Sequence, residues 1–180
     1  MSQGLRIAII IVAALVAVAA LVVASLFLWR RTVRHHIVTL IGKRAGVEAA
    51  FATVEGLVGT LARASDGELV ALALNPAAEE RKTLEEVAEQ MEILADELAT
   101  MPLPKRLWDA ANELSDAASE LWRQTSRVTG KEGIDALDAL GELDLVRVQT
   151  HVDAGGALLG ELAGRYDVGD AAVYGGGLYI

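Results

Sequence analysis

Histidine and acidic side chains are the residues of this chain that could hold a metal ion or transfer protons. The histidines are His35, His36 and His151, and cysteine is absent. His151 has no other histidine or cysteine to join it, so we expect a partly exposed polar residue and not a ligand. The sequence contains neither His-Glu-x-x-His nor the Glu-x-x-His of di-iron helical proteins. The nucleotide-binding and hydrolase motifs built on glycine are absent too. We therefore predict no metal site, no cofactor and no catalytic residue.

Two tryptophans are the side chains best suited to an apolar ligand. Trp108 and Trp122 are separated by two heptads, so they lie on one side of a helix. We expect both to pack in the core. The alternative is a pocket for a small apolar ligand between the helices.

The segment 166–180 contains all three tyrosines and is rich in glycine. It has too much glycine for a helix and is too apolar for a typical disordered end. We predict that it contacts a membrane interface, or that a partner binds it. Packing against a glycine strip at 156, 160 and 164 is an alternative. The candidate partner-binding residues are Tyr174, Leu178, Tyr179 and Ile180.

The elements that position these residues start with an apolar segment at 7–29 that has no charge, proline or glycine. At about 1.5 Å per residue it covers roughly 35 Å, enough to cross the ~30 Å hydrocarbon core of a bilayer. A cleaved signal peptide is the alternative, but its apolar region is usually shorter. Because this segment ends at Trp29 and is followed directly by Arg30 and Arg31, we predict a retained transmembrane helix.

Basic residues are concentrated directly after this segment. Only Arg6 precedes it, whereas five follow it: Arg30, Arg31, Arg34, Lys43 and Arg44. Lysine and arginine beside a span stay on the cytoplasmic side, so we predict a cell-membrane protein with its N-terminus outside and residues 30–180 in the cytoplasm. We interpret these residues as an ordinary anchor flank. A dedicated lipid or nucleic-acid site is the alternative.

The rest of the chain is acidic. Its first acidic residue is Glu48, and all 25 aspartates and glutamates lie from there onward. Such a surface repels nucleic acid. We expect the partners to be the lipid bilayer and a protein partner or a second copy of the chain, and not nucleic acid.

Apolar residues recur at intervals of three and four over most of residues 30–165, which predicts amphipathic helices. We expect one helix from the membrane to about residue 63, a short turn of helix at 68–74, and helices at 76–100, 104–128 and 134–164. Gly141 is expected to bend or interrupt the last of these, whose core side would include Ile134. In the helix at 104–128, the core stripe alternates strictly at intervals of four and three residues: Leu107, Ala111, Leu114, Ala118, Leu121, Thr125 and Val128.

The predicted fold class is therefore all-α. A short flank at 1–6 and the transmembrane helix at 7–29 precede an up-down-up-down four-helix bundle at 30–165 and a Gly/Tyr-rich tail at 166–180. In such a bundle the second connector and the end of the fourth helix lie near the membrane. The membrane interface would then include Trp29, Arg30, Arg31, Arg34, Lys105, Arg106 and Trp108.

This layout resembles LemA-type proteins and bacterial sensor domains, by arrangement alone. The sequence predicts a non-enzymatic, single-pass membrane protein whose bundle serves as an interaction or scaffold module. The alternative is a sensor-type bundle that binds a small apolar ligand. An enzyme is the least favoured interpretation, since no residue is a candidate for catalysis.

Overall fold

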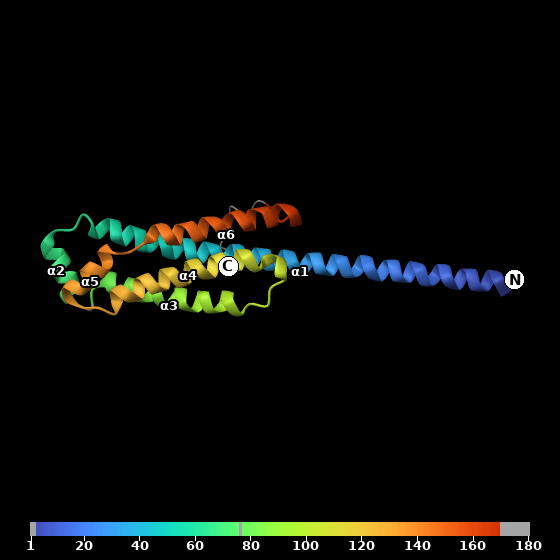
Figure 1. The fold of residues 1–180 in the computed structure, drawn as a ribbon, viewed down its shortest axis with the longest axis horizontal. Coiled ribbons are helices and arrows are strands. Elements are labelled where there is room, and N and C mark those ends of the chain that lie inside the picture. The colour runs from blue at the N-terminus through green and yellow to red at the C-terminus, as the bar shows by residue number, and fades with distance from the viewer. Residues whose placement is uncertain (1–2, 76, 170–180) are drawn as a thin grey trace.

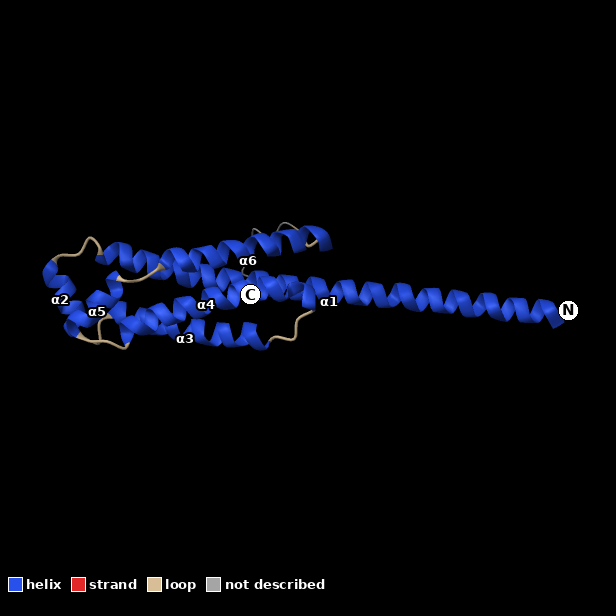
Figure 2. Cartoon of the chain, in the orientation of Figure 1, coloured by secondary structure: helices blue, strands red, loops and turns tan. Residues whose placement is uncertain are grey.

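The computed structural model describes residues 3–75 and 77–169, and these residues form helices joined by short connections, without a strand (Figure 2). The prediction of an all-helical chain with one long apolar N-terminal helix is confirmed. The elements are α1 (Gln3–Leu61), α2 (Asp66–Leu74), α3 (Glu79–Thr100), the 3₁₀ turn η1 (Lys105–Leu107), α4 (Trp108–Thr129), α5 (Gly133–Gly141) and α6 (Leu145–Tyr166).

The first half of α1 projects alone from the rest of the molecule (Figure 1). Its large apolar side chains between Val12 and Leu28 are 53% to 69% exposed wherever the structure describes them. Among the described residues, α1 is the one helix long and apolar enough to cross a membrane. It runs without interruption into the second half, so the expected continuity between the apolar segment and the first helix of the domain is present.

The second half of α1 packs against the other long helices. Burial begins at Val33, which is 1% exposed, and continues along one face through Ile37, Leu40 and Val47. Contacts join α1 with α6, α3 and α4. Residues 33–75 and 77–169 therefore pack together, with α1, α3, α4 and α6 side by side (Figure 1), and we call this part of the chain the helical domain.

α4 is central to this domain because it contacts α1, α3, α5 and α6. All seven residues of the stripe predicted for 104–128 are buried, six of them in α4 and Leu107 in η1. Ala110, Ala117 and Gln124 are buried too, one position before three residues of that stripe. The buried face of α4 is thus wider than its apolar pattern indicates, as a helix with several neighbours requires.

α3 begins at Glu79, three residues later than the sequence predicts. The Asn75 side chain accepts a hydrogen bond of 3.0 Å from the Ala77 amide, so it forms a turn before the helix. Arg81 is 6% exposed and donates to the carbonyls of Thr129 and Lys131, at 3.1 and 2.7 Å. These bonds join the start of α3 to the end of α4.

The interruption expected at Gly141 is present, and it separates α5 from α6. The Asp144 carboxylate caps α6 by accepting from the Arg147 amide at 3.2 Å. The placement of Ile134 on the core side is wrong, since its side chain is 74% exposed. The interruption ends the helical periodicity of α6, and α5 instead buries Ala136 and Ala139.

Candidate functional site

Three of the residues selected from the sequence, Trp29, Arg34 and Arg106, lie where the exposed half of α1 meets the helical domain. The Trp29 ring, from α1, lies 6.1 Å from the Tyr166 ring at the end of α6, in an edge-to-face arrangement of 66°. The Arg106 guanidinium, from η1, lies 5.4 Å from the centroid of the Trp29 ring. It also donates to the Tyr166 hydroxyl at 3.3 Å. Three elements thus meet around one tryptophan.

Arg34 joins α1 to the end of α6. Its Nε donates to the Tyr166 carbonyl at 2.6 Å, and its Nη2 donates to the Asp167 carboxylate at 3.0 Å and to the Asp167 carbonyl. Asp167 has a left-handed backbone with φ of 54°, which ends α6. A cation at this position satisfies carbonyls that the helix leaves without partners. We call Trp29, Arg34, Arg106, Tyr166 and Asp167 the collar.

The other predicted interface residues lie around the collar without joining it. The Trp108 indole donates to the Leu103 carbonyl at 2.9 Å, so this side chain closes the connector between α3 and α4. Arg30, Arg31 and Lys105 are exposed, and their side chains form no hydrogen bond or ion pair with another described residue.

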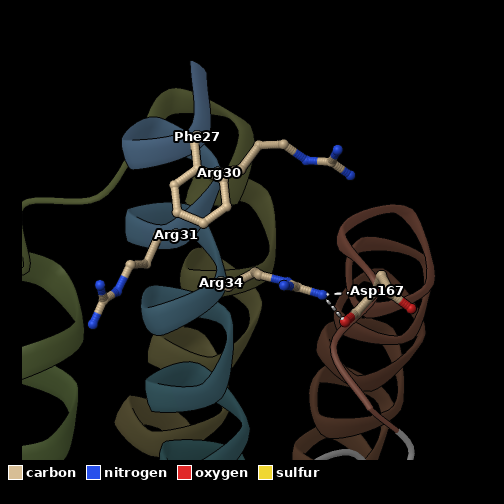
Figure 3. A pocket seen from close by; sticks show the side chains of 5 residues that line it. All are labelled: Phe27, Arg30, Arg31, Arg34 and Asp167. Atoms are coloured by element: carbon tan, nitrogen blue, oxygen red, sulfur yellow. Dashed lines mark hydrogen bonds and ion pairs between the residues drawn. The ribbon is translucent and has the colours of Figure 1, made fainter. Parts of the chain in front are cut away.

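A cleft of about 420 Å³ lies beside the collar. Phe27, Arg30, Arg31 and Arg34 line it from α1, and Asp167 lines it from the end of α6 (Figure 3). The candidate tail residues Tyr174, Leu178, Tyr179 and Ile180 lie outside the described residues.

The expectation that both tryptophans are buried is wrong. Trp108 is 51% exposed and Trp122 is 37% exposed. Each follows a buried leucine, Leu107 or Leu121, by one position, which places it about 100° around the helix from the core stripe. Trp122 borders an open hollow of about 560 Å³ between α3 and α4, lined also by Ile93, small residues and the carboxylates of Glu92 and Asp96.

The described residues do not meet the requirements of a metal site. Among residues 3–75 and 77–169, no group of three histidine, cysteine or acidic side chains lies close enough to hold a metal ion. His151 is partly exposed, as the sequence predicts, and its Nδ1 lies 2.8 Å from a Glu113 carboxylate oxygen. This contact joins α6 to α4.

Glu120 of α4 is a charged residue that sequence reasoning missed, and it is only 8% exposed. Its carboxylate accepts from Arg123 at 2.5 and 3.1 Å and from Gln124 at 2.7 Å. The hydrogen bonds from Arg123 lower the pKa of Glu120 below its usual value, although burial acts in the opposite direction. The Glu-x-x-Arg-Gln spacing on one helix was the available signal for this group.

Tyr166 and Asp167 are the other functional candidates whose roles the sequence did not indicate. Sequence reasoning assigns Tyr166 to the tail, whereas it is a buried residue of α6. Asp167 counts against a membrane interface by its charge, yet it pairs with Arg34.

Comparison with family models, with curated proteins and with solved structures finds no match to this chain.

Proposed function

We propose that this chain is a single-pass protein of the cell membrane whose helical domain is a non-enzymatic interaction or scaffold module. The observation that carries the proposal is the apolar half of α1, whose described large side chains are more than half exposed up to Leu28. Water disfavours an exposed apolar helix of this length, whereas a bilayer accepts it. Trp29 and two arginines follow at once, as is typical of the end of a span.

The charge distribution supports the orientation in this proposal. One arginine precedes the apolar segment and five basic residues follow it closely, so the N-terminus lies outside and the domain lies in the cytoplasm. The contacts of α1, α3, α4 and α6, with their short connections, support an up-down-up-down four-helix bundle. In that arrangement the collar lies at the membrane surface, and α2 and α5 lie at the far end.

The surface of the domain supports a protein partner over nucleic acid. All 25 acidic residues lie in the domain and its tail. The domain therefore repels phosphate backbones everywhere except at the basic residues near Arg30. Together with the bilayer, the partner is another protein or a second copy of this chain. The part of the tail that we propose such a partner binds contains Tyr174, Leu178, Tyr179 and Ile180.

Two measurements on the full chain test this proposal. Alkaline carbonate treatment of membranes should leave the protein in the membrane pellet, since only a peripheral protein is released. A pull-down from detergent-solubilised membranes should capture a partner with the full chain and lose it when residues 170–180 are deleted. Release by carbonate contradicts the anchor, and equal capture by both forms contradicts the role of the tail.

The hollow beside Trp122 favours a second candidate, a bundle that senses a small apolar ligand. Its volume of about 560 Å³ lies in the range of ligand sites, and Trp122 and Ile93 give it apolar walls. An apolar ligand bound there should change the tryptophan fluorescence of the full chain. The change should disappear in Trp122→Phe and persist in Trp108→Phe, because Trp108 does not line the hollow.

A further inference from the structure

The cleft between α1 and the end of α6 joins an apolar surface to a cationic one. Phe27, Arg30, Arg31 and Arg34 are spaced by three, one and three residues, so they share one face of α1. Figure 3 shows the Arg34 side chain directed at Asp167, the Arg30 side chain on the same side of α1, and the Arg31 side chain extending to the other side. Phe27 is 69% exposed, and Val23, one turn before it, is 65% exposed. The cleft is therefore apolar toward the span and basic toward the domain.

The three arginines of this cleft have different roles. Arg34 is bound to Tyr166 and Asp167 and so holds the wall of the cleft in place. Arg30 and Arg31 form no ion pair with another described residue. The lining thus has three guanidinium groups against one carboxylate, and two of the three are available to a ligand. Guanidinium groups bind phosphate oxygens in bidentate geometry, which makes an anionic phosphate the matching ligand.

We propose that this cleft binds the phosphate of one anionic glycerophospholipid through Arg30, with Arg31 adding positive charge on the other side of the cleft lining and an acyl chain along Phe27 and Val23. The Asp167 carboxylate favours a headgroup with a single phosphodiester over one with several phosphates, because it repels further negative charge. The proposal rests on the membrane anchor proposed above. It goes beyond an ordinary basic flank, which attracts anionic lipid generally and without an acyl-chain groove.

Quenching of Trp29 by brominated lipids tests this site in the full chain. Trp108→Phe and Trp122→Phe leave Trp29 as the single tryptophan, and both replaced side chains are exposed. This protein is reconstituted in phosphatidylcholine vesicles that contain either brominated phosphatidylglycerol or brominated phosphatidylcholine. We expect half-maximal quenching at a mole fraction about tenfold lower for the brominated phosphatidylglycerol.

Two double variants separate the cleft from net charge. Arg30→Gln with Arg31→Gln should remove the preference for phosphatidylglycerol. Arg63→Gln with Lys131→Gln removes the same charge from exposed residues at the other end of the domain and should retain the preference. Loss in both double variants, or in neither, overturns the proposed site.

The remaining outcomes distinguish the site from the anchor. Equal quenching by the two brominated lipids overturns the site and leaves the anchor intact. Absence of quenching by either lipid overturns the anchor itself. Millimolar glycerol 3-phosphate should leave the preference unchanged, and reversal by this compound would assign the cleft to a soluble phosphate ester instead of a lipid.

Discussion

The collar shows which single residues a sequence can identify. Trp29, Arg34 and Arg106 were predictable because aromatic and basic side chains gather where a span ends. Their partners were not, since the pairing depends on where α6 ends and on the left-handed backbone of Asp167. From the sequence alone, the negative charge of Asp167 near a predicted membrane surface is unfavourable. The structure explains it, because the carboxylate pairs with Arg34.

Glycines on α6 allow a test of helix packing at the scale of one methyl group. A Cβ added at Gly155 would lie 3.0 Å from Leu114 Cδ2, whereas one at Gly160 would meet nothing within 4 Å. Gly160→Ala should raise the free energy of unfolding by about 0.5–1 kcal/mol, through helix propensity alone. Gly155→Ala should be less stable than Gly160→Ala by at least about 1 kcal/mol, because Leu114 is fully buried and must move. Urea unfolding in mild detergent, followed by tryptophan fluorescence, measures both, and equal gains would contradict this packing.

The buried carboxylate of Glu120 leads to a prediction about how stability depends on pH. Its pKa is lowered in the folded state by the Arg123 hydrogen bonds, so it stabilises the fold above the pKa of an unfolded glutamate, about 4.3. This contribution is lost as the pH falls through the lower, folded pKa. The Glu120→Gln variant should therefore lose less stability than the wild type between pH 6 and pH 3. Thermal unfolding across this range checks it, with Glu89→Gln, an exposed change on α3, as the control. Parallel curves for Glu120→Gln and the wild type would show that the carboxylate has no such role.

At the scale of elements, the regular stripe that runs from η1 along α4 was predictable and the offset residues were not. Its seven stripe positions are buried, because strict alternation of three and four residues leaves one face for the core. The tryptophans were misjudged because their size suggested burial, although their position one residue after the stripe turns them toward the surface. The prediction for Ile134 failed because α5 is a separate helix, and the helical periodicity of α6 does not continue across the break after Gly141.

The attachment of α6 to α1 provides a prediction at this scale. Arg34→Gln should free the end of α6, because it removes the ion pair with the Asp167 carboxylate and the hydrogen bond to the Tyr166 carbonyl. Amide hydrogen exchange at 163–168 should then become faster, while exchange in α4 stays as in the wild type. Arg31→Gln is the matched control, since Arg31 lies one turn away and makes no bond to α6. Similar exchange in both variants would mean that the aromatic contact alone holds this end.

At the scale of the whole molecule, one helix joins an exposed apolar segment to the packed helical domain. α1 is continuous over 59 residues, so the exposed apolar half and the buried half of the same helix have a fixed relative orientation. The part from Arg30 to Leu61 extends roughly 48 Å at ~1.5 Å per residue. As a scaffold, the chain would hold α2 and α5 at that distance from the collar. The sequence predicted both halves, because their compositions differ sharply at Trp29, but it did not indicate the collar that fixes the domain to the start of its buried half.

The orientation of the chain in the membrane is the prediction that belongs to this scale. Five basic residues follow the apolar segment and one precedes it, so the C-terminus should be cytoplasmic. Two reporters fused separately after Ile180 measure this: alkaline phosphatase, active only outside the cytoplasm, should be inactive, and green fluorescent protein, which fluoresces only inside, should be bright. Changing Arg30, Arg31 and Arg34 to glutamine while adding three lysines before the span reverses the charge difference and should invert both signals. A bright phosphatase signal from the unchanged chain would place the acidic domain outside the cytoplasm, and its proposed partners would then have to be sought there.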